Sequence, residues 1–466
     1  MTTLRHRPPS VALGEPDPTL TPRAGLHLVA EVDRALGVVD TLDRQIGPVK
    51  ARRRGLSGGE LVMALVETML CGGDFLADLD YQRDDAVGAL VRAVPEVPAS
   101  TTFIGLAKRF GDDVFCGIER AMGELVGRWF DLLPQTQRER LSASRPTIDL
   151  DPTDVEVYGT KKEGVAFNYR AQRCGRPHPA VWAEAGMVLA AELGSGRSDP
   201  RPQAPSLIVR AVRSLPGGLG RPVVRADSGL FSKKVAEAAL AQGCDFAIAA
   251  RRTSAVWRAE RGVPEGAWRP AQGMEAEVAS CAYVPGGWPE GTGCIVRRVK
   301  VERSELRADR RTRRRRTIDP QQLKLLEDGE TEVAYAYSFI VTNLAGDVVA
   351  IEAWFRRRAL IDERIGDSKA GMALRHLPSG YQAVNRTWMW AAFLALNLSG
   401  WLQSLAGVDD SGRAHGKRLR RELVNVAGRL CCHTRRLVVR VAPEHHQGPF
   451  ATAWSTLATL PSFAGP

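Results

Sequence analysis

Acidic side chains lie at the ends of two strand-like runs and on one helix-like segment of this sequence. Asp149 and Asp151 close the first run, Asp227 closes the second, and Asp362 and Glu363 lie on an arginine-rich segment with helical spacing. Mg²⁺ prefers oxygen ligands and usually takes one or two carboxylates together with substrate phosphates. Two such ions can stabilise the attacking and the leaving oxygen of an in-line phosphoryl displacement. These residues therefore predict a site for two Mg²⁺ ions, with Mn²⁺ as an alternative, that cuts or joins nucleic acid.

The charge balance of the chain favours a polyanionic partner. The 466 residues include 64 Lys and Arg against 53 Asp and Glu, which gives a formal net charge of +11. Excess positive charge favours nucleic acid as a partner, although many basic surfaces are only solvated, so the charge alone does not identify the partner. A hydrophobic content of 44% is ordinary for a folded protein. The length exceeds that of one average domain and indicates two or three structural units.

Neither the cysteines nor the apolar segments indicate secretion or a membrane. The 8 cysteines show no CxxC spacing, so core thiols are favoured over a disulfide scaffold or a zinc site. Residues 1–18 are polar and proline-rich and lack the apolar core of a signal peptide. The most apolar stretch, 388–402, is shorter than a bilayer span and contains Asn397 and Ser399. We therefore expect a cytoplasmic protein in which this stretch is a buried helix.

The N-terminal quarter is predicted to be helical after a flexible arm of residues 1–25. Apolar residues recur at helical spacing through residues 26–133, and the triplet Arg52–Arg54 and the pair Lys108–Arg109 add positive charge. This pattern favours a helical domain that binds DNA ends. A helical bundle that only supports the core is the alternative, and the sequence leaves both open.

The pattern changes to alternating strands and helices in residues 146–250. Strands are predicted at 147–158, 165–170, 181–193, 222–226 and 245–250, and helices at 205–213 and 232–242. The first strands can form antiparallel hairpins, and the later ones can add in parallel through helical crossovers. This order is similar to an α/β fold of the ribonuclease-H-like (retroviral-integrase-like) type. In that fold, the acidic clusters occupy the ends of the first and fourth strands and a late helix.

The rest of the chain is divided into an insertion, the end of the core and a basic tail. Residues 251–350 are predicted to be a β-rich insertion, 351–405 the last part of the core with the acidic helix, and 406–466 a basic C-terminal region of helical residues and an irregular tail. The insertion contains an arginine run that is too charged to pack and is expected to form an exposed loop. Lys and Arg gain affinity for a phosphate backbone by releasing counterions. DNA contact is therefore favoured over a merely solvated loop for its arginines, Arg313, Arg314, Arg315 and Arg316.

Three segments in this order resemble a known family. They are Asp149-Leu150-Asp151-Pro152-Thr153, Arg225-Ala226-Asp227-Ser228-Gly229, and the stretch 355–369. The chain from about residue 56 to 405 resembles bacterial insertion-sequence transposases of the DDE type, in the branch with a Y-x2-R-x3-E-x6-K signature.

The resemblance implies which acids hold the metal ions. Its Asp-x-Thr pattern selects Asp151 as the first acid, and Asp227 is the second. The third departs from the signature, because aspartate stands at the glutamate position as Asp362, and Glu363 follows it. Aligning the arginine and lysine of the signature with Arg358 and Lys369 selects Asp362, whereas the side-chain length of glutamate favours Glu363, so the choice stays open. Phe355 replaces the tyrosine of the signature.

The resemblance also implies a reaction and its partners. A metal-activated water would attack the phosphodiester at a transposon end, and the freed 3′-hydroxyl would attack target DNA. Arg358 and Lys369 would hold DNA-end phosphates, and Arg225 would contact phosphate or pair with a carboxylate. A homodimer is expected in the DNA complex, at the bacterial nucleoid. Trp388 and Trp390 could stack on a flipped base, although core packing is favoured. The alternatives are an inactive or repurposed transposase that binds DNA, and a ribonuclease-H-like nuclease.

Overall fold

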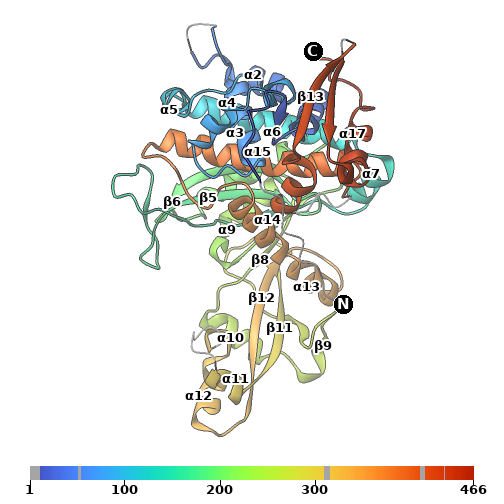
Figure 1. Cartoon of the computed structure of the whole chain (residues 1–466). Helices are drawn as coiled ribbons and strands as arrows, with labels where there is room; N and C mark the ends of the chain where they lie inside the picture. Colours follow the sequence, from blue (N-terminus) through green and yellow to red (C-terminus); the bar gives the residue numbers. More distant parts are fainter. Residues whose placement is uncertain (1–10, 51–53, 309–314, 410–414, 435, 466) are drawn as a thin grey trace, which may run out of the picture.

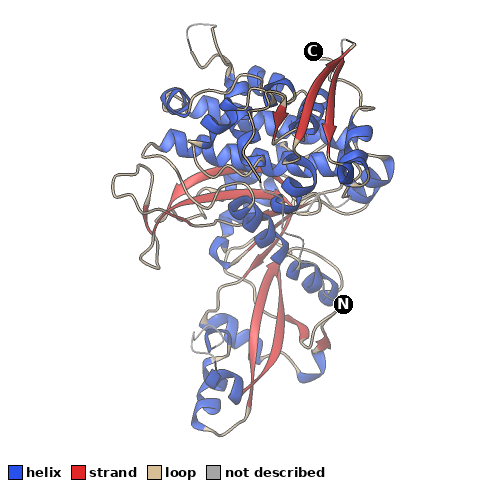
Figure 2. Ribbon diagram, viewed as in Figure 1, coloured by secondary structure: helices blue, strands red, loops and turns tan. Residues whose placement is uncertain are grey.

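The protein consists of a helical and sheet-containing body from which a long arm extends (Figure 1). The computed structural model describes residues 11–50, 54–308, 315–409, 415–434 and 436–465. Helices lie mainly above the sheet of the body, and the arm is built around long antiparallel strands (Figure 2). Across these residues, no helix is long and apolar enough to cross a bilayer. These helices and strands form an α/β fold with a mixed sheet, as the sequence predicts.

One mixed sheet runs through the body and into the arm, in the order β3-β5-β2-β7-β8-β12-β11-β10-β9. Two further strands, β4 and β6, also pair with β5. The pairs β2–β7 and β7–β8 are parallel, and the pairs on either side of them are antiparallel. The strands of the body are β2 (Thr147–Leu150), β3 (Val155–Glu156), β4 (Ala166–Phe167), β5 (Arg173–Trp182), β6 (Met187–Ser195), β7 (Val223–Ala226) and β8 (Asp245–Ala249).

The parallel strands are connected by helices that cover the sheet. Between β6 and β7 runs α8 (Ala204–Arg213), which has a proline in its first turn, and between β7 and β8 runs α9 (Lys233–Ala241). Proline suits a first helical turn because the N–H that it lacks would be unpaired there. All four residues of β2 and of β7 are buried. Short, fully buried strands of this kind are typical of a sheet covered on both faces.

Helices from both ends of the chain form the upper layer of the body. Its central helix, α15 (Gln382–Leu405), is almost entirely buried and packs against α3, α6 and β6. Ser57 and Glu60 form a capping box that fixes the start of α3. The other helices of this layer are α1 (Leu26–Leu36), α2 (Val38–Ile46), α3 (Gly58–Leu70), α4 (Asp78–Asp84), α5 (Ser100–Ala107), α6 (Asp112–Leu132) and α7 (Gln135–Ser142).

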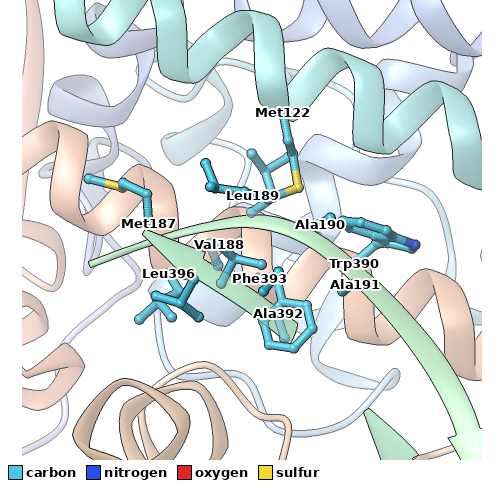
Figure 3. Close-up of a cluster of buried hydrophobic side chains, with 14 of the residues drawn as sticks. Met122, Met187, Val188, Leu189, Ala190, Ala191, Trp390, Ala392, Phe393 and Leu396 are labelled. Atoms are coloured by element: carbon cyan, nitrogen blue, oxygen red, sulfur yellow. The ribbon is translucent and has the colours of Figure 1, made fainter. Parts of the chain in front are cut away.

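Figure 3 shows how this layer meets the sheet, with Met122 of α6 on one side of β6 and Phe393 and Leu396 of α15 on the other. Trp388 and Trp390 are 0% and 2% exposed, so the prediction of core packing is confirmed and base stacking by these residues is excluded.

The outer edge of β6 is covered by a side chain of α15. The Asn397 amide donates to Val188 O at 2.8 Å, and its Oδ1 accepts from Val188 N at 2.8 Å. An uncovered sheet edge would offer unpaired backbone groups to other chains. Asn397 therefore both satisfies this edge and positions α15 against the sheet.

The strand predicted at 181–193 is wrong, because the chain reverses within it. β5 ends at Trp182, a turn contains Gly186 at a φ of 67°, and β6 begins at Met187. The positive φ favours glycine at that position. The first two predicted strands are also shorter than expected, and residues 151–154 form a loop after β2.

The arm is continuous with the sheet of the body. Its strand β12 pairs with β8 at one end and with β11 along its whole length. The elements of the arm are α10 (Ser254–Arg261), β9 (Arg269–Pro270), β10 (Glu277–Cys281), β11 (Gly293–Glu302), α11 (Arg303–Ala308), α12 (Pro320–Asp328) and β12 (Val333–Thr342). The strands β9 to β12 lie within residues 251–350, which the sequence predicts to be rich in β-structure.

The C-terminal region contains more regular structure than the sequence predicts. The short α16 (Gly416–Leu419) runs into a π-helical turn, and a hairpin of β13 (Gly428–His433) and β14 (Arg436–Val441) follows. β1 (Leu20–Thr21) pairs with β13, so the end of the N-terminal segment 1–25, which the sequence predicts to be flexible, belongs to a small sheet. Arg429 and Arg436 lie on strands rather than on a helix. The final residues are not an irregular tail, because they include α17 (Pro449–Leu457).

Candidate active site

Asp151 and Asp227 lie next to each other at the ends of two parallel strands. The residues that precede them, Leu150 and Ala226, are directly paired in the register of β2 and β7. Carboxyl ends of parallel strands meet at one edge of a sheet, where ligands of open α/β proteins tend to bind. The Asp227 carboxylate also accepts from Gly229 N at 2.9 Å, which fixes the turn after β7.

The third acid comes from α14 (Ala359–Ala370), which follows α13 (Val348–Arg356) after a short turn. Asp362 lines a cavity of about 650 Å³ together with Asp151, Asp227 and Lys369. Glu363 instead lines a separate cavity of about 30 Å³. The structure thus brings Asp362 to the other two acids and does not bring Glu363 there, because neighbouring residues on a helix point about 100° apart.

Arg358 forms an ion pair with the first acid. Its Nη2 lies 2.8 Å from Asp151 Oδ1, and the two side chains are 17% and 15% exposed. Despite this short distance, Nε and Nη2 of Arg358 are buried and have no well-directed hydrogen bond among the described residues. Burial raises the pKa of Asp151 to about 7; Arg358 opposes this rise, and the charges of Asp227 and Asp362 add to it. The cavity therefore holds more negative charge than its own basic residues offset.

Lys369 holds the other end of α14 against the same loop. Its Nζ donates to the backbone carbonyl of Asp154 at 2.8 Å, and burial lowers its pKa. Arg358 at the start of the helix and Lys369 near its end thus both contact the segment from Asp151 to Asp154. Neither forms the ion pairs within the helix that its spacing allows. Together they fix the side of α14 that carries Asp362 toward the sheet.

Arg225 pairs with a buried carboxylate, one of the two roles expected for it. Its side chain is 2% exposed, and its Nε and Nη2 lie 2.6 and 2.7 Å from the two oxygens of Asp149. Its remaining nitrogen, Nη1, donates to Trp354 O at 2.6 Å. The alternative of pairing with a carboxylate is the one that the structure shows. Asp149 faces the small cavity that Glu363 lines, away from Asp151.

The described part of the arginine run lies on the arm, away from the acids. Arg313 and Arg314 fall outside the described residues. Arg315 and Arg316 begin a short turn before α12, and Arg315 pairs with Glu327 at 2.7 Å. The helices α11 and α12, which flank the run, lie at the end of the arm distant from α14 (Figure 1).

The donor atoms of the cavity suit a hard divalent cation. Oxygen ligands from carboxylates are what Mg²⁺ and Mn²⁺ take up, and a bound cation would favour the ionised form of Asp151, whose pKa is raised by burial and, to a lesser degree, by Asp227 and Asp362. Within the described parts of the chain, no group of three or more His, Cys, Asp or Glu is close enough to hold one ion. Mg²⁺ needs only one or two protein carboxylates when phosphates complete its shell. Asp151 and Asp227 fit that requirement.

Sequence reasoning missed the residues that organise the loop after β2. Asp154 accepts from Arg176 Nε at 2.6 Å and from Asn168 Nδ2 at 2.8 Å. Both partners come from β5 and its preceding turn. The available signal was the position of Asp154 three residues after Asp151, but its partners depend on strand pairing that the sequence does not show.

The chain belongs to the family of transposase DDE domains. The family model, transposase DDE domain group 1, matches residues 10–462, nearly the whole chain. The resemblance to DDE transposases is thereby confirmed, and the Y-x2-R-x3-E-x6-K branch stays a prediction. Among solved structures, a piggyBac transposase synaptic complex with hairpin DNA is similar at 11% identity and a TM-score of 0.40, covering 85% of this chain and 78% of that chain. Among curated proteins, no sequence matches the chain.

Proposed function

We propose that the protein is a DNA transposase that cleaves the ends of an insertion sequence and joins them to target DNA with Mg²⁺ or Mn²⁺. The observation that carries this proposal is the convergence of Asp151, Asp227 and Asp362 on one cavity from three separate elements. The β-strand order supports a ribonuclease-H-like core, with residues 251–343 as an insertion between β8 and the acidic helix.

The residues at the cavity are carboxylates and the basic side chains that position them. Asp151 and Asp227 would hold the metal ions, and Asp362 would complete the set. Bound divalent ions would activate the attacking oxygen and neutralise charge on the phosphate. Lys369 keeps the loop after β2 against α14. Arg358 offsets the charge of Asp151 and would contact a phosphodiester that binds beside this carboxylate.

DNA is the proposed partner of the cavity and of the arm. A net charge of +11 favours association with a polyanion. Arg315 and Arg316 on the arm would contact the DNA backbone, and we propose the same role for Arg313 and Arg314, which precede them in the sequence. Two copies of the chain are needed to bring two transposon ends together, so we propose a homodimer in the DNA complex, at the nucleoid of a bacterial cell.

A second candidate is a protein of the same family that binds DNA without cleaving it. The observation in its favour is the shorter aspartate at the third position, since misplacement of a reacting group by about 1 Å can cost on the order of a hundredfold in rate. A ribonuclease-H-like nuclease without joining activity is a third reading. The arm argues against it, because a simple nuclease has no use for a separate long DNA contact.

The test compares neighbouring residues of α14 in an end-cleavage assay. The substrate is a duplex that contains the inverted repeat flanking the gene, incubated with the full chain and Mn²⁺ or Mg²⁺. Asp362→Asn and Asp227→Ala should each abolish cleavage, whereas Glu363→Gln should retain it. Specific DNA binding without metal-dependent cleavage by the unmodified protein would favour the second candidate. Cleavage without joining of a 3′-hydroxyl end to a second duplex would favour the nuclease.

A further inference from the structure

Three exposed aromatic residues lie on the segments next to one end of β5, and one of them, Tyr169, lines the acidic cavity. Tyr158, Phe167 and Tyr169 are 88%, 55% and 81% exposed. Tyr158 follows β3, Phe167 is in β4, and Tyr169 follows β4. The strands β3 and β4 both pair with β5 at Cys174, one on each edge of β5. In Figure 1, loops near the labels β5 and β6 extend outward from the body. Large aromatic residues this exposed are available to bind a ligand.

The turn that carries Tyr169 is built around a buried asparagine. Asn168 is 7% exposed, and its Oδ1 accepts from the backbone N–H of Arg170 at 2.9 Å and of Gln172 at 3.0 Å. Its Nδ2 donates to Asp154 Oδ2 at 2.8 Å. Ala171, three residues after Asn168, has a φ of 57°, a conformation that is costly for a residue with a Cβ. The turn is therefore held in one shape and is tied to Asp154.

Asp154 connects this turn to the acids. It follows Asp151 by three residues, and its backbone carbonyl accepts from Lys369 of the acidic helix. Tyr169 and Arg170 line the same cavity of about 650 Å³ as the three acids. The position of the Tyr169 ring relative to the acids is thus set by hydrogen bonds and is not left to a loose loop.

The aromatic rings are accompanied by positive charge. The Arg170 guanidinium lies over the Tyr169 ring at 5.2 Å from its centroid, and its Nε donates to the Tyr169 hydroxyl at 2.9 Å. Lys161 is exposed between Tyr158 and Phe167 in the sequence. An aromatic ring next to a cation can bind an unpaired nucleotide, since the base stacks on the ring and the cation contacts the backbone.

We propose that Tyr169, with Arg170 beside it, forms a stacking platform for unpaired nucleobases next to a phosphate that would bind in the acidic cavity. This inference rests on the proposed function for the identity of the ligand as DNA. It adds that the preferred substrate is a duplex whose bases are unpaired at the reacting end. Stacking on one aromatic residue contributes roughly five- to hundredfold in affinity per base, as judged by substitution with alanine.

The test measures binding without catalysis. Fluorescence anisotropy in EDTA compares the full chain on two duplexes of equal length, one blunt and one with several unpaired bases at its end. We expect the unmodified protein to bind the forked duplex about tenfold more tightly, a preference within the range of one stacked base. Tyr169→Ala should remove most of this preference and Tyr169→Phe should keep it. Tyr81→Ala is the matched control, because Tyr81 is 70% exposed on α4 and lies outside the cavity.

The outcomes separate this proposal from the proposed function. Equal affinity of the unmodified protein for both duplexes, or an unchanged preference in Tyr169→Ala, would overturn the platform even if metal-dependent cleavage is observed. A Tyr169-dependent preference in a protein that never cleaves DNA would support the platform and overturn the transposase activity. Because Tyr169 is exposed, Tyr169→Ala should keep the melting temperature of the unmodified protein, which is measured alongside.

Discussion

The ion pair between Arg358 and Asp151 should make binding of divalent cations depend on DNA. In the unliganded protein, Arg358 provides the positive charge nearest to Asp151, at an Nη2–Oδ1 distance of 2.8 Å. A cation that binds Asp151 must displace or weaken this pair. A DNA phosphate near Arg358 would compete for its guanidinium and release Asp151. Arg358→Gln removes the competing charge and keeps a polar, shorter side chain.

The size of the effect follows from the geometry of the pair. At an effective dielectric constant of about 20, two charges at this separation attract by roughly 6 kcal/mol. Most of that is offset when a displaced arginine regains water or other partners, and exposed pairs measure only about 1 kcal/mol or less. With both side chains mostly buried, we expect a net competition of about 1.4 kcal/mol. This corresponds to tenfold tighter Mn²⁺ binding by Arg358→Gln.

The assay is Mn²⁺ titration of the full chain, followed by the electron paramagnetic resonance of free Mn²⁺, at pH 8 and with or without duplex DNA. Unmodified protein should gain affinity when DNA is added, whereas Arg358→Gln should bind Mn²⁺ more tightly from the start and gain little from DNA. Arg357→Gln is the matched control, since the neighbouring Arg357 is exposed and has no ion pair with Asp151. Unchanged or weaker Mn²⁺ binding by Arg358→Gln without DNA would refute the reasoning.

Further predictions concern the stability of the body. Burial raises the pKa of Glu67 to about 8, so the folded state holds a proton that the unfolded chain loses above its usual value of 4.5. The unfolding free energy should fall as pH rises through this window, and Glu67→Gln should remove as much as about 4 kcal/mol of that fall in urea titrations from pH 5 to 9. Asn397→Leu should cost about 2–4 kcal/mol, read as a lower melting temperature, because both polar backbone groups of Val188 lose their partner. Arg225→Ala should destabilise by about 3–5 kcal/mol by leaving Asp149 buried and unpaired, and adding Asp149→Ala should recover part of that loss; additive losses would contradict the pairing.

The positions of the first two acids could be predicted from the sequence because the determinants are local. A short run of β-branched residues followed by a carboxylate and glycine, as at Asp227, indicates a buried strand that ends in a turn. The order of strands and helices then brings Asp151 and Asp227 to the same edge. Gly186 is an equally local signal of a turn, and it marks the reversal between β5 and β6 within residues 181–193.

The choice between Asp362 and Glu363 could not be made from the sequence. Both residues lie on one helix turn, and either could face the sheet, depending on how α14 is rotated. That rotation is set by tertiary contacts, Arg358 with Asp151 and Lys369 with the carbonyl of Asp154. A family signature gives the spacing of these basic residues but not the atoms that they contact. The direction of Asp362 follows only once those partners are known.

The burial of Arg225 connects the fold to the geometry of the site. Each of the two acids at the strand ends follows a charged residue by two positions. Asp149 of β2 precedes Asp151, and Arg225 of β7 precedes Asp227. The two inner residues are directly paired in the strand register and form the buried ion pair.

A register slip of one residue would turn these side chains to opposite faces of the sheet and leave two charges buried without partners. A buried ion pair contributes little net stability compared with apolar packing, but it penalises every register except the one in which it forms. In that register the two acids that follow are neighbours as well. The pair of Asp149 and Arg225 thus explains why Asp151 and Asp227 lie side by side, although neither of its members faces the cavity.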